Sequence, residues 1–104
     1  MSKLYFYLVP DSHPDDEAVN TFEAECIGTL TQNNFLGLQV KGVFDSDLDY
    51  YDSFRLKLEK LKEMYAMLIA KHLEKTEDGS VIHPMLQDAM ENEVGLYAEC
   101  ETVS

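Results

Sequence analysis

One stretch constrains the fold more than any other: residues 48–73, in which apolar or aromatic side chains recur every three or four positions. The stripe consists of Tyr51, Phe54, Leu58, Leu61, Tyr65, Leu68 and His72. This spacing predicts an amphipathic helix. At about 1.5 Å of rise per residue, the helix would be roughly 39 Å long, which exceeds the width of a small domain. We therefore expect the rest of the chain to pack along it.

Local signals mark both ends of this predicted helix. Ser46 and Asp49 have the spacing of a capping box, with Asp in place of the usual Glu. Asp47 would lie near the positive end of the helix dipole, where a carboxylate is favourable. At the other end, the Asp-Gly pair at residues 78–79 supplies a turn. The sequence therefore predicts one continuous helix between the two signals.

Alternating apolar residues predict strands before this helix. Residues 3–9 are apolar on both alternating faces and end at a proline, which predicts a central strand. Residues 22–31 and 35–44 also alternate, and the polar residues 32–34 between them predict an antiparallel hairpin. A helix that begins at Ser12 is an alternative for the first arm.

Two further elements follow the long helix. Residues 82–90 have helical apolar spacing with Pro84 near their start, which predicts a short helix. Residues 94–101 predict a last short strand. With 104 residues, 45% of them hydrophobic, we expect a single domain over residues 1–104. The predicted class is α+β: a two-layer, three- or four-stranded, mostly antiparallel sheet packed on one long and one short helix.

The sequence contains no signal for a membrane or for export. No apolar run approaches the roughly 20 residues needed to cross a bilayer. Residues 3–9 are too short for the apolar core of a secretory signal. We therefore expect a cytoplasmic protein, in which Cys26 and Cys100 are reduced, buried thiols in preference to a disulfide.

The charge of the chain is unusual and unevenly distributed. The formal net charge is −12, yet residues 48–75 hold six basic and five acidic side chains. The remaining residues therefore hold fifteen acidic and only two basic side chains. Such a surface repels nucleic acid and anionic membranes and attracts basic partners. The alternative is that the charge only confers solubility.

A short motif, His-Pro-Asp-Asp-Glu at residues 13–17, follows the first predicted strand. It resembles the metal-binding motif of the zinc-dependent N-acetylglucosaminyl deacetylase superfamily. The resemblance implies zinc ligation by His13 and Asp16, a general base at Asp15, and a Rossmann-like sheet. It covers five residues, and the family's third ligand has no counterpart around the other two histidines. The alternative is an acidic surface loop.

A second acidic group suggests a calcium loop at first sight. Its members are Asp45, Asp47, Asp49 and Asp52. It does not meet the requirements of an EF-hand, because Tyr50 stands where a glycine is needed and Leu56 where a bidentate glutamate is needed. We therefore favour a role for these carboxylates at the positive end of the predicted helix.

Tyrosines close to acidic residues form a third group. Its members are Tyr50, Tyr51 and Tyr97, with Tyr5 and Tyr7 as further candidates. Tyrosine is favoured in protein interfaces, and acidic neighbours suit a basic partner. Tyr51 and Tyr65 fall on the helical stripe and are expected to be packed, whereas Tyr50 lies off it. Tyr50 is therefore the best interface candidate among them.

These patterns favour a non-enzymatic acidic inhibitor that occupies a basic, nucleic-acid-binding surface of a partner protein, such as a nuclease. Toxin-immunity proteins and phage-encoded anti-defence proteins, including anti-CRISPR proteins, fit the same physical description. The predicted partner-binding residues are Asp15, Asp16, Glu17, Asp45, Asp47, Asp49, Tyr50 and Asp52. We expect no cofactor, no direct nucleic-acid binding and no membrane contact. A monomer is favoured over a homodimer paired through residues 48–73. The alternative function is a small zinc-dependent hydrolase that uses residues 13–17.

Overall fold

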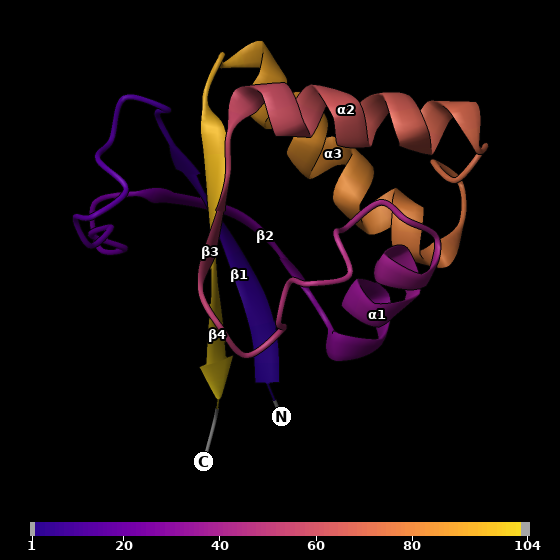
Figure 1. The fold of residues 1–104 in the computed structure, drawn as a ribbon, viewed down its shortest axis with the longest axis horizontal. Coiled ribbons are helices and arrows are strands. Elements are labelled where there is room, and N and C mark those ends of the chain that lie inside the picture. The colour runs from indigo at the N-terminus through magenta and orange to yellow at the C-terminus, as the bar shows by residue number, and fades with distance from the viewer. Residues whose placement is uncertain (1, 103–104) are drawn as a thin grey trace.

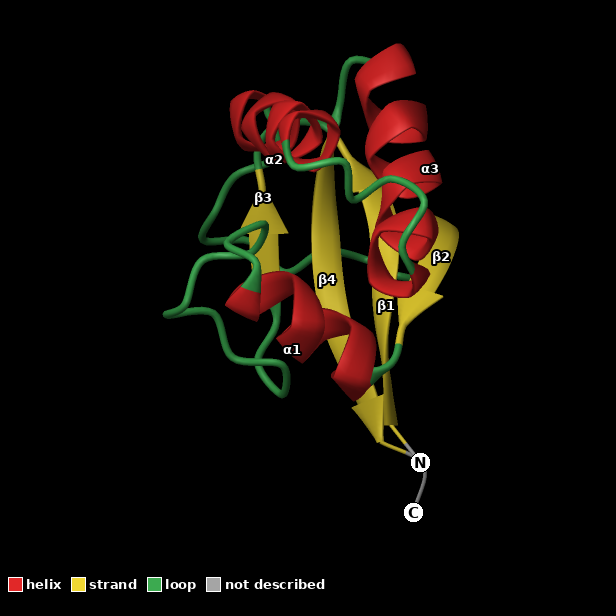
Figure 2. Cartoon of the chain, turned by 90° about the vertical axis from the view of Figure 1, so that its right-hand side faces the viewer, coloured by secondary structure: helices red, strands yellow, loops and turns green. Residues whose placement is uncertain are grey.

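The computed structural model describes residues 2–102, which form one antiparallel sheet of four strands with three helices on one face (Figures 1 and 2). The strands are β1 (Ser2–Val9), β2 (Glu25–Leu30), β3 (Phe54–Leu56) and β4 (Gly95–Thr102). The helices are α1 (Gln32–Val40), α2 (Leu58–Ala70) and α3 (Glu77–Glu91). The predicted two-layer α+β class is confirmed. Within residues 2–102, no helix has the length and apolar character needed to span a bilayer.

The strand order is β2-β1-β4-β3, so β1 and β4 are the central strands. They pair along their whole length, from Ser2 opposite Thr102 to Val9 opposite Gly95. The predictions of a central first strand and a last strand near residues 94–101 are therefore confirmed. β3 pairs only with the start of β4 and forms a short edge of the sheet.

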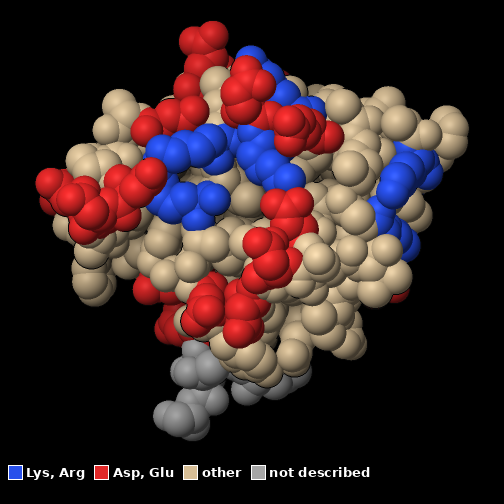
Figure 3. Space-filling model, in the orientation of Figure 1, with Lys and Arg blue, Asp and Glu red and all other residues tan. Residues whose placement is uncertain are grey.

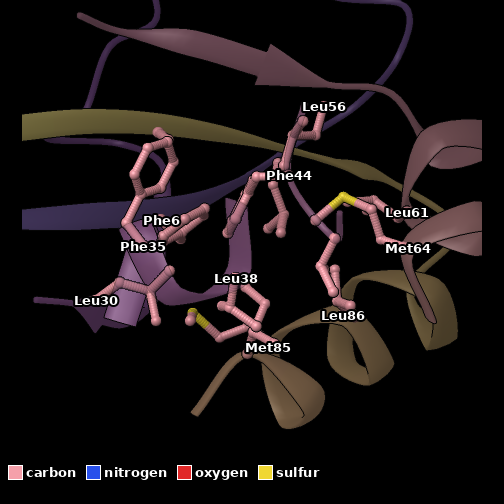
Figure 4. Close-up of a cluster of buried hydrophobic side chains, with 14 of the residues drawn as sticks. Phe6, Leu30, Phe35, Leu38, Phe44, Leu56, Leu61, Met64, Met85 and Leu86 are labelled. Carbon is pink, nitrogen blue, oxygen red and sulfur yellow. The ribbon is translucent and has the colours of Figure 1, made fainter. Parts of the chain in front are cut away.

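The hydrophobic core fills the space between the sheet and the helices (Figure 4). Leu4 and Phe6 of β1 face the helices and are fully buried, as are Leu61 and Leu68 of α2. Aromatic rings fill the end of the core near α1. The ring centroids of Phe35 and Phe44 lie 4.8 Å apart. Burial of this apolar area is the main favourable contribution to folding.

The predicted helix over residues 48–73 is wrong in its first half. Residues 48–53 form turns, and β3 follows them. α2 begins only at Leu58, whose backbone N–H lies 3.1 and 3.2 Å from the two carboxylate oxygens of Asp11. The cap therefore comes from a residue 47 positions earlier in the chain, and the predicted cap at Ser46 does not form. A cap this distant in sequence leaves no local signal.

The connection from α2 to α3 also differs from the prediction. His72 adopts a φ of 56°, a left-handed conformation that reverses the chain after α2. Residues 78–79, predicted as a turn, lie in the first turn of α3, where the Thr76 hydroxyl accepts from the Gly79 N–H at 3.1 Å. Pro84 lies inside α3 and does not open it. The predicted second helix is thus present, but it starts five residues earlier than 82 and has 15 residues, against 13 in α2.

The second arm of the predicted hairpin is a helix, α1, and not a strand. A capping box starts it: the Thr31 hydroxyl accepts from the Asn34 N–H at 3.1 Å, and the Asn34 side chain accepts from the Thr31 N–H at 3.4 Å. Phe35 and Leu38, three positions apart, are fully buried. Gly42 then takes a φ of 83°, which suits a residue without a side chain.

Candidate functional site

The face of the sheet that the helices leave uncovered carries three tyrosines. Tyr5 and Tyr7 lie on β1, and Tyr97 of β4 is directly opposite Tyr7. The ring centroids of Tyr7 and Tyr97 are 6.3 Å apart, within the range of an aromatic pair. All three side chains are partly exposed. We refer to Tyr5, Tyr7 and Tyr97 as the tyrosine face.

Two carboxylates of β4 lie on the same side of the sheet as the tyrosine face. The register places Glu99 opposite Tyr5 and Glu101 opposite Lys3, and directly paired residues share one side of a sheet. Neither glutamate forms an ion pair with another residue in the range 2–102. Their negative charge is therefore available to a partner at this face.

The environment of the tyrosine face raises the pKa of the Tyr7 phenol above its ordinary value of 10.0. Burial of the phenol is the largest cause, followed by electrostatic interactions with Cys26, Glu99 and Glu101. Both glutamates therefore act electrostatically on Tyr7, which lies between Tyr5 and Tyr97 on the tyrosine face.

Residues 10–24 connect β1 to β2 and lie on the helix-free side, at one end of the sheet (Figure 1). They form turns, so the helix considered from Ser12 is absent and the predicted strand begins only at Glu25. We refer to residues 10–24 as the acidic loop. Phe22 is almost fully exposed within it. The acidic loop borders the tyrosine face at Tyr97. It does not cover this face completely, because all three tyrosines remain partly exposed.

Arg55 of β3 holds the first half of the acidic loop in place. Its guanidinium donates to the carbonyl oxygen of His13 at 2.8 Å and to that of Pro10 at 2.9 Å. It also lies 3.3 Å from a carboxylate oxygen of Asp15. Because Arg55 pairs with Tyr97 across the sheet, these contacts bring the acidic loop next to the tyrosine face.

Lys57 strengthens the same attachment. Its ammonium group lies 3.0 Å from a carboxylate oxygen of Asp15 and donates to the carbonyl oxygen of Asp11 at 3.2 Å. The hydrogen bond from Lys57 is the largest cause that lowers the pKa of the Asp15 carboxyl, with its charge and that of Arg55 adding to it. The Asp15 charge is therefore used within the protein, whereas Asp16 and Glu17 form no ion pair with residues 2–102.

A pocket of about 340 Å³ lies where the acidic loop meets the sheet. Residues 15–19 line it from the acidic loop, and Arg55 and Tyr97 line it from the sheet. The pocket joins Asp16 and Glu17 of the acidic loop to Tyr97 of the tyrosine face. Predicted site residues from the acidic loop and Tyr97 are thus brought together, although they are far apart in sequence.

The two predicted acidic segments do not form one patch. Arg55, Lys57 and Lys60 lie between them: the first two bind Asp15, and Lys60 binds Asp45 at 2.8 Å. Figure 3 shows basic side chains as a strip on this side of the molecule, with acidic side chains on either side of it. The charge around residues 45–52 is therefore partly neutralised at the start of α2.

Two of the four acidic residues in 45–52, Asp45 and Asp49, have structural roles that the sequence did not indicate. No helix starts there, so their predicted role at a helix dipole is wrong. The Asp49 carboxylate accepts from the Tyr51 N–H at 2.9 Å and stabilises a turn. The Asp47 and Asp52 side chains are exposed and form no ion pair with residues 2–102. Only these two of the four carboxylates are free for a partner.

The expected exposures of Tyr50 and Tyr51 are reversed. Tyr50, the preferred interface candidate, is only 3% exposed and packs on Phe35 with ring centroids 5.8 Å apart. Tyr51, expected in the core, is 58% exposed. The reason is that this segment forms turns over α1, so the helical stripe does not apply to it. Tyr50 is unsuited to direct contact with a partner while it stays in the core.

The arrangement of residues 13–17 does not fit the zinc site that the resemblance implies. The Asp15 carboxylate is bound by two cations, and His13 Nε2 lies 3.2 Å from the Glu17 carbonyl oxygen. Among residues 2–102, no three His, Cys, Asp or Glu side chains are grouped to hold a metal ion. The antiparallel sheet also differs from the Rossmann-like sheet of that superfamily. We derive no zinc chemistry from this loop.

The two cysteines are free and lie on opposite faces of the sheet. Cys26 is opposite Tyr7 and is exposed, whereas Cys100 is opposite Leu4 on the helix side. The preference for thiols over a disulfide agrees with this geometry, but the expected burial of Cys26 is wrong.

The chain matches no protein-family model, no curated protein and no solved structure. The candidate site therefore depends on the geometry of the chain itself. Glu99 and Glu101 were missed in the sequence. They follow Tyr97 at intervals of two along β4, which places all three residues on one face of the strand. This spacing is the signal that could have identified them.

Proposed function

We propose that the protein is a non-enzymatic, cytoplasmic inhibitor that binds a basic partner protein through its helix-free side. The interface would consist of the tyrosine face, the two glutamates of β4 and the free carboxylates of the acidic loop. The single observation that carries this proposal is the partly exposed row of tyrosines beside carboxylates that have no ion pair in the described chain. It shifts the predicted interface away from residues 45–52.

The chemistry of this side favours a basic protein over other partners. Tyrosine offers a large contact area at low entropic cost, and the carboxylates attract cations while repelling nucleic acid and anionic lipids. Protein surfaces that bind nucleic acid are rich in Lys and Arg. An acidic protein that covers such a surface would exclude the nucleic acid. This is the mode of action that we propose, with a nuclease or nucleic-acid-binding complex as the partner.

We also propose that the protein acts as a monomer. A homodimer through paired helices would need the apolar stripe of α2 at its surface. Leu61 and Leu68 on that stripe are fully buried against the rest of the chain. Sedimentation at micromolar concentration would give the mass of one chain, and a dimer there would contradict the proposal.

The test begins with capture of the partner from a lysate of the native cell. The protein is immobilised, nucleic acid is digested, and bound proteins are eluted with a salt gradient. The captured partner is then used to measure association with two charge-reversal variants. One is Glu99→Lys/Glu101→Lys on the helix-free side, and the matched control is Glu59→Lys/Glu63→Lys on the exposed side of α2.

The Glu99→Lys/Glu101→Lys variant should have an association rate at least about tenfold lower, because electrostatic steering is lost. Its association rate should also depend less on salt concentration. The control, which has the same net charge, should change much less. Equal slowing of both variants would mean that only net charge matters, and the helix-free side would lose its assigned role. Stoichiometric zinc in the purified protein, lost on His13→Ala, would instead support the hydrolase alternative.

A further inference from the structure

The pocket between the acidic loop and the sheet has walls of two different kinds. Residues 15–19 of the acidic loop line one side, and Arg55 and Tyr97 line the side of the sheet. Phe54 also borders the pocket, but its ring packs in the core against Phe6 and Phe44, so Tyr97 supplies the aromatic surface. Its volume of about 340 Å³ is near the lower end of the range of small-ligand pockets, roughly 300 to 1,000 Å³. A space of this size suits one long side chain with part of its backbone better than a whole cofactor.

The charge of the pocket favours a cation. Arg55 also lines the pocket, but its guanidinium is turned into the acidic loop and bound by Asp15 and by two carbonyl oxygens. This leaves the carboxylates of Asp16 and Glu17 without a compensating charge among the described residues. The pocket is therefore lined by two acidic residues that form no ion pair among residues 2–102 and by one cation whose two terminal nitrogens are already bound, with only the buried Nε of Arg55 lacking a partner.

The aromatic side of the pocket selects among cations. A guanidinium group is planar, stacks on aromatic rings and binds a carboxylate through two parallel hydrogen bonds. An ammonium group is a compact charge that is more strongly hydrated, so it gains less from a ring and a carboxylate together. The combination of Tyr97 with Asp16 and Glu17 thus suits arginine better than lysine.

We propose that this pocket receives one arginine side chain of the basic partner. The inference deepens the proposed function and depends on it for its biological meaning. The guanidinium stacks on the Tyr97 ring and is bound by Asp16 or Glu17. The pocket would then determine the position of the partner on the tyrosine face, because one arginine of the partner must enter the pocket.

The binding of arginine to the pocket can be tested without the partner. Nα-acetyl-arginine N-methylamide is titrated into isotope-labelled protein at constant ionic strength, and amide and tyrosine side-chain resonances are followed by NMR. The citrulline analogue, which has nearly the same shape without the charge, and the lysine analogue are titrated in parallel. We expect saturable shifts at Tyr97 and residues 15–19 with arginine, weaker shifts with lysine and none with citrulline.

A pair of variants localises the site. Asp16→Asn/Glu17→Gln should weaken arginine binding by about fivefold, as expected for the loss of one exposed ion pair and of the second negative charge beside it. Asp47→Asn/Asp52→Asn changes the charge equally and should leave the binding unchanged. All four side chains are exposed, so both variants should fold. Equal binding of arginine and citrulline, equal binding of arginine and lysine, or equal weakening in both variants would overturn the proposal.

The result is separable from the test of the proposed function. If arginine binds the pocket but the Glu99→Lys/Glu101→Lys variant captures the partner normally, the pocket stands and the tyrosine face fails as the interface. If arginine does not bind the pocket but the Glu99→Lys/Glu101→Lys variant associates slowly with the partner, the tyrosine face stands as the interface and the pocket is not its arginine site.

Discussion

The two faces of the sheet are built from alternate residues of the same strands, yet they are very different environments. Leu4 and Phe6 of β1 face the helices and are fully buried, whereas Tyr5 and Tyr7 between and after them remain partly exposed. In the sequence, both sets are apolar or aromatic, and this pattern predicts a strand in the centre of the sheet. The chain itself covers only one side. The partly exposed tyrosines are therefore the part of the sheet that we propose a partner covers.

The largest predicted effect concerns the covered face. Leu68→Ala should lower the free energy of unfolding by about 2 to 5 kcal/mol, because it leaves a cavity at a position that is fully buried. Its neighbour Ile69 is 41% exposed, so Ile69→Ala should cost much less. Urea unfolding of both variants measures the contrast. Similar losses in the two variants would mean that α2 does not present the Leu68 side to the core.

The elements predicted correctly are those whose pattern is local. β1, β4 and the helical spacing of residues 58–70 and 82–90 all follow from the alternation or spacing of their own residues. α1 differs from the predicted strand because residues 35–44 alternate as a strand does, and the polar residues before them resemble a turn. The Thr31–Asn34 capping pair was the signal that could have identified it.

The errors at the site arose from contacts that are distant in sequence. The start of α2 is fixed by Asp11 and the acidic loop by Arg55, and neither contact has a local signature. Because the predicted helix was extended too far, Tyr50 and Tyr51 exchanged their expected environments. The acidic residues 15–17 could be named from the sequence, but their position next to Tyr97 could not.

The second prediction concerns this long-range cap. Asp11→Ala should lower the free energy of unfolding by about 1 kcal/mol, the usual effect of losing an N-cap. Ser46→Ala is the matched control, because the sequence pointed to Ser46 as the cap and the structure does not use it. Thermal unfolding should show a lower Tm for the first variant only. A lower Tm for Ser46→Ala alone would instead indicate that the helix begins near Ser46, as the sequence predicts.

The smallest effect concerns the electrostatics of the uncovered face. Replacing both Glu99 and Glu101 by Gln should lower the pKa of Tyr7, yet leave it raised, because burial remains the larger cause. The raised pKa means that the folded state favours the protonated phenol. The free energy of unfolding therefore falls as pH rises from the unfolded value of 10.0 through the folded-state pKa. The double variant should therefore lose less stability above pH 10.

The Cζ resonance of each tyrosine, followed by NMR against pH, gives the pKa values directly. Tyr7→Phe identifies the resonance. An unchanged pKa of Tyr7 in the Gln variant would show that the two carboxylates do not act on the centre of the tyrosine face.

The most direct test of the central claim is hydroxyl-radical footprinting of the tyrosines, with and without the captured partner. The chain carries its own control, because Tyr51 is 58% exposed and lies in the other acidic segment. We predict that binding lowers the oxidation of Tyr5, Tyr7 and Tyr97 and leaves that of Tyr51 unchanged. Protection of Tyr51 with no change on the tyrosine face would place the interface at residues 45–52 and contradict the account.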